Sequence, residues 1–346
     1  MRHATLLALL ATVFVPVHAE ECRVLYPAPQ QGDRLVWHGA CRDGMAEGPG
    51  VISLDRPGKT SIRYEVTLAH GDIAGEGALL AEDGKVYAGT FHQGQPHGRG
   101  YFRFANGATY EGEVAHGQPE GQGTWTSQQG TRYVGQWKAG KKQGRGRIEY
   151  ALGGSYDGDW SGDTYNGHGV LTYAGSGRRV EGEFHDGWPA GVARPAPVEP
   201  SSERYVLRED MPRTGTSIRR EIVSAPVPLD KGYAELTPGQ RAVVRQPYEA
   251  LAASDEPPYP LGGPKLFYEA LAKAFKRIGA SGELKLLVRV GADGVAQSVT
   301  AIGAPTPELV RFASGLVMLQ QYKPAVCDGK PCDMIYPAYF KFEALQ

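Results

Sequence analysis

The sequence predicts a mainly β protein in which a run of antiparallel hairpins is followed by a small α+β module. Glycine supplies 47 of the 346 residues, about twice its ordinary share of roughly 7%. An aromatic residue also recurs at a fixed interval through the first half of the chain. In the last third, helical apolar patterns alternate with hairpin signals, and this order predicts the second module.

The interval is 23 residues, and it divides residues 36–191 into about seven copies of one phrase. Glycine follows the first residue of each copy by two, seven, eleven and thirteen places, and 25 of these 28 places hold glycine. The exceptions are Val66, Asp163 and Ala193. The copies begin at Trp37, Tyr64, Tyr87, Tyr110, Tyr133, Tyr156 and Val180; the five tyrosines are 23 residues apart, Trp37 precedes them by 27 and Val180 follows by 24.

Each copy predicts two strands joined by a glycine-rich turn. Residues 110–114 alternate between apolar or small and polar side chains, which is the period of a half-buried strand. The second strand of a copy shows the same alternation. In the copy that begins at Tyr133, Ile148 and Tyr150 fall on one face and Glu149 on the other. The glycines between the strands supply backbone angles that other residues resist.

This phrase resembles the MORN repeat, a β-hairpin unit of about 23 residues, and the resemblance implies a ribbon of stacked antiparallel hairpins. MORN repeats are often linked with acidic phospholipids, but the solvated face carries acidic pairs that oppose such binding. Both charge groups also fit a simple role in solubility. The acidic residues are Glu111, Glu113, Asp157, Asp159, Glu181 and Glu183, and the one strong basic cluster is Lys138, Lys141, Lys142, Arg145 and Arg147.

Residues 1–19 are predicted to be a signal peptide that is cleaved after Ala19. Arg2 and His3 precede an apolar run over residues 4–15, and small residues precede the cleavage point. The run is shorter than the ~20 residues of a membrane span. We therefore expect export to the periplasm, with an inner-membrane anchor as the alternative if the segment is retained. Residues 20–35 form an N-terminal segment.

Cys22 is predicted to pair with Cys41, and Cys327 with Cys332. An even number of cysteines at paired spacing in an exported chain favours disulfides. Structural zinc needs four ligands, and neither pair has a second pair at finger-like spacing. Histidines in the repeat turns make a weaker case for a metal. We predict no metal, cofactor or catalytic site.

Residues 192–204 are predicted to be a proline-bearing linker, and residues 205–254 a connecting segment without an assigned function. Within that segment, Thr237 and Gln240 have the spacing of a helix capping box. The final module is expected over residues 255–346. Its predicted elements are a helix over 266–278, strands over 283–290 and 295–302, a helix over 307–321 and a last hairpin of residues 322–326 with 334–342, whose turn places Cys327 opposite Cys332.

This order resembles the C-terminal domain of TonB-family energy transducers. The resemblance is carried by Pro258-Tyr259-Pro260, the run that starts at Gly282, Asp293-Gly294-Val295 and Tyr322-Lys323-Pro324-Ala325. It implies a domain that pairs an exposed strand with a segment of an outer-membrane transporter. The partner-binding residues implied on the last strand are Ile335, Tyr336, Tyr339, Phe340 and Phe342; a strand that is simply packed is the alternative.

The TonB resemblance departs at the N-terminus, because TonB proteins keep a membrane helix that couples them to a motor. Cleavage after Ala19 removes the apolar segment and with it the basis for force transduction. Membrane association is expected only if that segment is retained.

No catalytic signature is found: the sequence lacks His-Glu-x-x-His, Gly-x-Ser-x-Gly and a Walker A loop. A net charge of −1 gives no field for nucleic acid or anionic membranes. We therefore expect a non-enzymatic adaptor. Either the C-terminal module binds an envelope or outer-membrane protein by strand addition, or the ribbon binds an envelope protein or cell-wall component and the module caps it.

Overall fold

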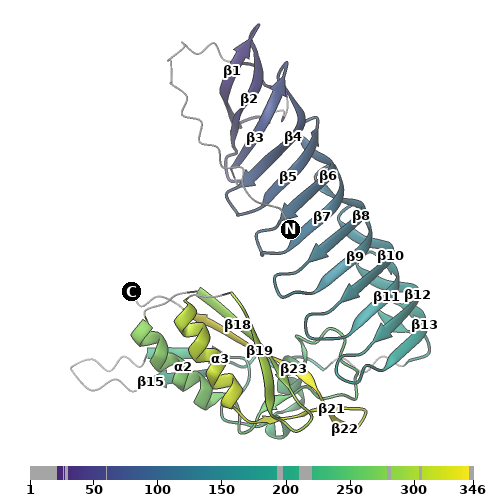
Figure 1. Ribbon diagram of the computed structural model, residues 1–346, viewed down its shortest axis with the longest axis vertical. Coiled ribbons are helices and arrows are strands. Elements are labelled where there is room, and N and C mark those ends of the chain that lie inside the picture. Colours follow the sequence, from purple (N-terminus) through teal and green to yellow (C-terminus); the bar gives the residue numbers. More distant parts are fainter. Residues whose placement is uncertain are drawn as a thin grey trace. The chain divides into compact units, whose positions relative to one another are not determined.

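The computed structural model describes residues 22–25, 27, 30–59, 61–192, 198–209, 220–278, 282–303 and 306–342. The predicted signal peptide lies outside these residues. The described chain is mainly β, and strands β1 to β14 form one antiparallel sheet in chain order (Figure 1). The chain divides into two compact units after Phe102, and each is described separately.

The first unit contains three hairpins and an N-terminal segment that is tied to them. The Cys22–Cys41 disulfide joins this segment to the first strand. Next to it, the backbone N–H of Arg23 donates to Gly44 and its carbonyl accepts from Ala46. The strands are β1 (Arg34–Arg42), β2 (Met45–Asp55), β3 (Ile62–Ala69), β4 (Asp72–Ala81), β5 (Val86–His92) and β6 (Gln95–Arg103).

The second unit begins with four more hairpins and then the connecting segment. The hairpin strands are β7 (Thr109–Ala115), β8 (Gln118–Thr126), β9 (Arg132–Lys138), β10 (Lys141–Glu149), β11 (Ser155–Ser161), β12 (Thr164–Thr172), β13 (Arg179–His185) and β14 (Trp188–Pro189). A small hairpin of β15 (Tyr205–Glu209) and β16 (Arg220–Ala225) follows, then a short 3₁₀ helix (Tyr233–Glu235) and α1 (Pro238–Arg245). The predicted capping box of Thr237 and Gln240 at the start of α1 is confirmed.

The hairpin turns account for the glycines that lie seven places after the first residue of a copy. In a typical turn, His116 and Gly117 both have positive φ, 49° and 74°, as a two-residue type I′ turn requires. In the sixth copy the order is reversed, so that Gly162 comes first and Asp163 takes a φ of 75°. Its backbone N–H still donates to the carbonyl of Lys142 in the preceding hairpin, 3.1 Å away. Asp163 therefore departs from the sequence pattern without departing from the turn.

The other glycines make room for the tyrosines that open four of the copies, Tyr87, Tyr110, Tyr133 and Tyr156. Tyr110 is fully buried, and a Cβ atom on Gly123 would lie 2.3 Å from its hydroxyl oxygen and 2.4 Å from its ring. Glycine is thus required there by contact with the ring. The same relation holds between Tyr133 and Gly146 and between Tyr156 and Gly169. Each tyrosine hydroxyl also donates to the carbonyl three residues on, as in Tyr110 to Glu113 at 2.6 Å.

Tyr110, Tyr133 and Tyr156 are joined through the tryptophans that follow the last two of them by four places. Trp137 lies edge-on between Tyr110 and Tyr133, with ring centroids 5.3 and 5.2 Å away. Trp160 lies likewise between Tyr133 and Tyr156. The Trp160 indole N–H donates to the Gly146 carbonyl at 2.9 Å. Aromatic pairs of this kind contribute about 0.5–1.5 kcal/mol each beyond their burial, so the contacts link successive hairpins.

The C-terminal module is a three-stranded sheet of order β19-β18-β23 with two helices on one face (Figure 1). Leu284, Leu286 and Val288 of the central strand are fully buried in one core with Leu309 of α3. Its main elements are α2 (Lys265–Ile278), β18 (Gly282–Val290), β19 (Ala296–Ile302), α3 (Pro307–Leu319) and β23 (Met334–Phe342).

The predicted last hairpin is wrong. β23 pairs along its whole length with β18, while β20 (Tyr322–Lys323) pairs with β17 (Tyr259–Pro260) and β21 (Ala325–Cys327) with β22 (Lys330–Cys332). Cys327 lies opposite Lys330, so the Cys327–Cys332 disulfide joins residues that are not directly opposed. The Asp333 carboxylate accepts a hydrogen bond from the backbone N–H of Ala292, 2.9 Å away. This bond holds the chain at the end of β18, beside which β23 then runs.

Replacing Gly123 with alanine is expected to lower the free energy of unfolding by about 1–3 kcal/mol, because the new methyl group meets the Tyr110 ring. Urea denaturation followed by tryptophan fluorescence measures this. In a Tyr110→Leu background the same change should cost clearly less. An equal cost in both backgrounds would show that the ring does not constrain position 123.

Candidate functional site

Strand β23 is an edge strand of the C-terminal sheet. β18 pairs with one side of it, and no strand of the described chain pairs with the other. An open edge of this kind can accept an added strand through main-chain hydrogen bonds. The structure therefore places the five predicted partner-binding residues on an edge; whether they bind a partner stays a prediction.

The side chains of β23 differ in their exposure. Phe340 is buried in the core beneath the helices, with Tyr336 packed against it. Burial raises the pKa of Tyr336 well above its ordinary value. Ile335 packs on the opposite face against a second cluster that includes Tyr248. Tyr339 is 50% exposed, and the side chain of Phe342 lies outside the described residues.

Among the described residues, the main chain of β23 is open only toward its C-terminal end. In an antiparallel ladder, every second residue directs its N–H and C=O away from the partner strand. Pro337 has no N–H to give to β18, which places Ile335, Pro337 and Tyr339 in the outward-facing set. The outward carbonyl of Ile335 already accepts a 2.8 Å hydrogen bond from the Tyr248 hydroxyl. A complete donor and acceptor pair is thus offered first at Tyr339.

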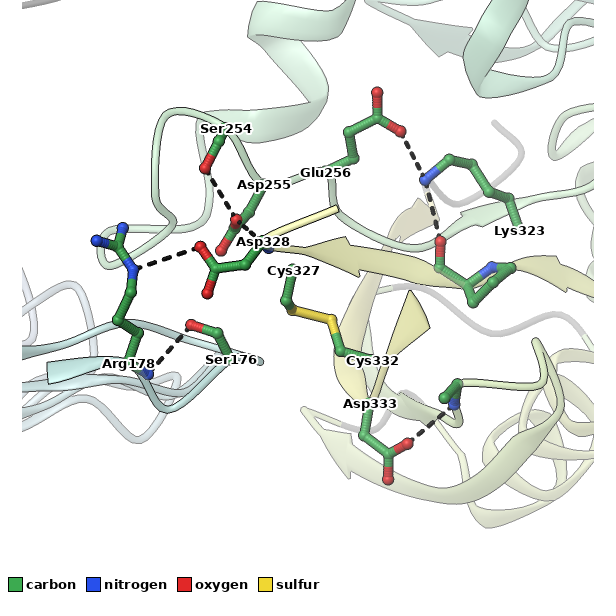
Figure 2. Close-up of a disulfide and its surroundings, with 12 residues drawn as sticks. Ser176, Arg178, Ser254, Asp255, Glu256, Lys323, Cys327, Asp328, Cys332 and Asp333 are labelled. Carbon is green, nitrogen blue, oxygen red and sulfur yellow. Dashed lines mark hydrogen bonds and ion pairs between the residues drawn. A yellow bond between two sulfur atoms is a disulfide. The ribbon is translucent and has the colours of Figure 1, made fainter. Parts of the chain in front are cut away.

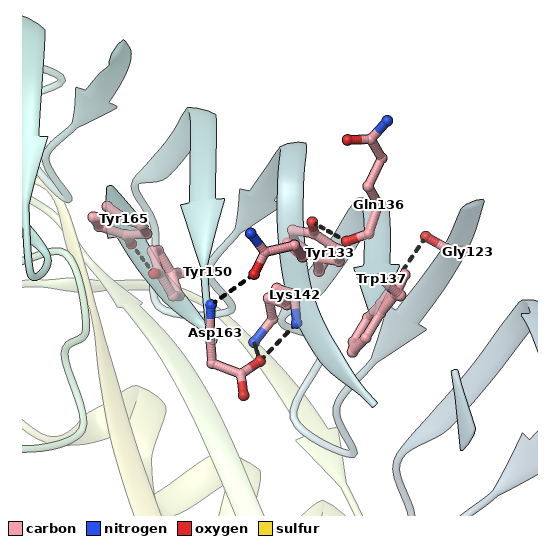
Figure 3. A network of polar contacts seen from close by, with 10 residues as sticks. Gly123, Tyr133, Gln136, Trp137, Lys142, Tyr150, Asp163 and Tyr165 are labelled. Atoms are coloured by element: carbon pink, nitrogen blue, oxygen red, sulfur yellow. Dashed lines mark hydrogen bonds and ion pairs between the residues drawn. The ribbon is translucent and has the colours of Figure 1, made fainter. Parts of the chain in front are cut away.

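A second unusual site lies on the aromatic face of the repeat sheet (Figure 3). The Lys142 ammonium is 5.5 Å from the ring centroids of Trp125 and Trp160 and 5.6 Å from that of Tyr133. It is also 3.6 Å from the Asp163 carboxylate. The side chains of Lys142 and Asp163 are 17% and 46% exposed, so the lysine is largely enclosed by rings that favour a cation.

Sequence reasoning counted Lys142 with the surface lysines and did not find this arrangement. The available signal was its position nine residues after Tyr133. At that position the other copies carry Ala46, Ile73, Pro96, Pro119, Tyr165 and Pro189. A charged residue in a series of apolar ones on an inward face marks a site with its own partners.

An open pocket of about 230 Å³ adjoins Lys142. The hydroxyl groups of Tyr150 and Tyr165 are in contact there, and burial raises the pKa of Tyr150 to about 12. Glu249, from the segment after α1, also lines the pocket. Removal from water raises the pKa of its carboxyl, while Thr131, Lys142 and Lys285 act to lower it.

The outer face of β10 and β11 is a cross-strand charge ladder. Arg145 lies opposite Asp159 and Arg147 opposite Asp157, with nitrogen–oxygen distances of 3.5 Å in both pairs. Together with Lys142, three of the five residues of the predicted basic cluster are therefore paired with carboxylates. This pairing reduces the positive potential that an anionic lipid surface would need.

Within the described part of the chain, no three His, Cys, Asp or Glu side chains are grouped to hold a metal ion. Its helices are all too short or too polar to cross a membrane. The two disulfides, Cys22–Cys41 and Cys327–Cys332, indicate an exported chain that folds in an oxidising environment.

Replacing Lys142 with alanine is expected to destabilise the repeat sheet by about 1–3 kcal/mol, because both the ring contacts and the packed aliphatic stem are lost. Lys142→Met keeps a packed stem and should cost less. Urea denaturation monitored by tryptophan fluorescence compares the variants. Lys141→Ala, on the exposed neighbouring residue, is the control, and a loss as large as that of Lys142→Ala would contradict the assignment.

Comparison with known proteins identifies the repeat. Residues 87–109, 110–132, 133–154 and 156–178 each match the family model of the MORN repeat, which covers four of the about seven predicted copies. A search of curated proteins gives no match to the chain. The chain therefore contains MORN repeats, and these repeats indicate a role in binding a protein or a membrane surface.

Proposed function

We propose that this chain is a non-enzymatic adaptor of the periplasm whose C-terminal module binds an envelope protein by strand addition. The resemblance to TonB-family domains suggests a TonB-dependent outer-membrane transporter as one candidate partner. The adaptor needs no cofactor, since main-chain hydrogen bonds supply its affinity. The observation that carries this proposal is the open edge of β23.

The open stretch begins at Tyr339, where an outward-facing N–H and C=O are both available. Tyr339 is half exposed and offers an aromatic surface beside the main chain, a combination that suits recognition of an extended peptide. Pro337 and the bonded carbonyl of Ile335 limit pairing further along the strand. We therefore assign partner binding to the C-terminal end of β23.

A protein partner is favoured over an anionic membrane by the charges on the repeats. Arg145 and Arg147 of β10 are matched across the sheet by carboxylates, while Glu111 lies opposite the neutral Thr124. The positive charge of these two arginines is thus neutralised, which lowers the attraction of this face to an anionic membrane. In the proposed adaptor the repeats carry and position the C-terminal module.

The alternative is that the repeat sheet itself binds an envelope protein or a cell-wall component. A shallow depression of about 420 Å³ on the second unit favours it, because its lining combines carboxylate, amide and ammonium groups that could bind a glycan. Part of this polar lining is already used, since Glu113 accepts from the backbone of Gln122 and Gln136 from that of Arg145. For this reason we rank the alternative second.

Strand addition is tested by two substitutions at one position of the full-length chain. Tyr339→Pro removes the outward N–H that an added strand would use, without removing a bond to β18, and is expected to lower capture of the envelope partner about tenfold. Tyr339→Ala keeps the N–H and should lower capture only about two- to threefold. Immobilised protein is exposed to a solubilised envelope fraction, and retained proteins are quantified by mass spectrometry. Equal capture by wild type and Tyr339→Pro would reject strand addition.

Export is tested separately. We expect the mature chain to begin at Glu20 and to be recovered with the soluble periplasmic proteins. N-terminal sequencing after cell fractionation measures both. Recovery of an intact N-terminus in the inner membrane would contradict cleavage and favour the anchored alternative.

A further inference from the structure

The C-terminal module and residues 246–252, which precede it, are docked on the repeats within the second unit. Contact is made by connecting turns that join successive hairpins, at residues 150–154 and 173–178. The backbone N–H of Ala174 donates to the Ala250 carbonyl at 2.7 Å. Leu152 is buried in one cluster with Tyr248, Cys327 and Met334.

The disulfide-closed loop takes part in the same contact (Figure 2). Arg178 of the last connecting turn is 3.4 Å from the Asp328 carboxylate. The backbone N–H of Asp328 donates to Asp255, a fully buried carboxylate. The loop is therefore held on one side by the module's own interior and reaches the repeats on the other.

Two glycines of the connecting turns leave space for these parts of the chain: Gly175 for the module and Gly154 for Ala250. A Cβ atom on Gly175 would lie 2.5 Å from Met334 Cε and 2.6 Å from Cys327 Sγ. One on Gly154 would lie 2.6 Å from the Cβ of Ala250. A Cβ atom on Gly177, in the same turn as Gly175, would meet nothing within 4 Å apart from its own chain neighbours. The close approach is thus confined to the positions that the module and residues 246–252 cover.

This contact combines an apolar cluster, an exposed ion pair and a backbone hydrogen bond. Its apolar part is a cluster of five buried residues, and its ion pair joins side chains that are 45% and 50% exposed. Exposed pairs contribute little and weaken with salt. Interfaces of limited area between parts of one chain permit relative motion.

The segment that docks on the turns also covers the edge of β23. We name residues 246–252 the latch segment. Its Ala250 carbonyl binds the repeats, and its Tyr248 hydroxyl binds the outward carbonyl of Ile335. Tyr248 is 7% exposed, and burial raises the pKa of its hydroxyl well above the ordinary value, so the group stays a neutral donor.

We propose that the docked arrangement is autoinhibited: the repeats hold the latch segment against β23, and a partner strand must displace it to pair with the edge from Ile335 onward. This inference rests on the proposed function. Release extends the available edge from the Tyr339 end back to Ile335, and only the N–H missing at Pro337 interrupts it. The competing occupant is an extended peptide strand, since the group that is blocked is a main-chain carbonyl.

The test compares Gly175→Ala with Gly177→Ala in the full-length chain. Both glycines have positive φ, 75° and 65°, so the backbone strain of alanine is similar, but only position 175 faces the module. We expect Gly175→Ala to speed hydrogen exchange of the latch segment about tenfold and to raise envelope-partner capture about threefold or more. Gly177→Ala should change neither. Tyr248→Phe, which removes only the blocking hydroxyl, should also raise capture.

The outcomes distinguish autoinhibition by the latch segment from strand addition to β23. If Gly175→Ala speeds exchange and capture does not rise, while Tyr339→Pro still lowers capture about tenfold, autoinhibition is wrong and strand addition stands. If Tyr339→Pro leaves capture unchanged, strand addition itself fails and autoinhibition falls with it. Unchanged exchange in Gly175→Ala would show that the connecting turns do not hold the latch segment.

Discussion

The tyrosines that open the central repeats and the glycines beneath them form the contact on which this part of the sheet depends. At Tyr110 the ring occupies the space that a side chain on Gly123 would fill, and its hydroxyl bonds the chain three residues on. Because the ring contacts both strands of its own hairpin, it fixes their register. The edge-on Trp137 and Trp160 then carry the contact from one hairpin to the next, which is how stacked repeats without a common globular core remain cooperative.

A series this regular makes its exceptions informative. Lys142 replaces an apolar residue, and the rings around it and the Asp163 carboxylate supply the partners that a charge needs on an apolar face. Asp163 is itself one of the three exceptions to the glycine pattern. The lysine at an apolar position and the aspartate at a glycine position therefore occur together, as an ion pair. Both lie beside the pocket that Glu249 helps to line. The repeats are therefore specialised where the connecting segment approaches them.

Docking of the module has consequences for the rest of the chain. The Cys327–Cys332 disulfide closes a short loop whose inner side bonds Asp255 and whose outer side approaches Gly175. β23, which follows this loop, keeps one open edge, and the latch segment covers part of it. The binding strand and the repeats are thus linked through a few residues of the connecting segment, which had no predicted role.

The sequence by itself determined the hairpin series, the glycine-dependent turns, the capping box of α1, and α2, β18, β19 and α3 of the last module. These features are encoded by residues close together in the chain, through side-chain alternation, turn chemistry and capping at fixed spacing. Tertiary structure alone decided that β23 pairs with β18, that three rings enclose Lys142 and that Tyr248 bonds Ile335, 87 residues away. Contacts over such separations depend on which surfaces meet after the local elements have formed, and no local pattern specifies that choice.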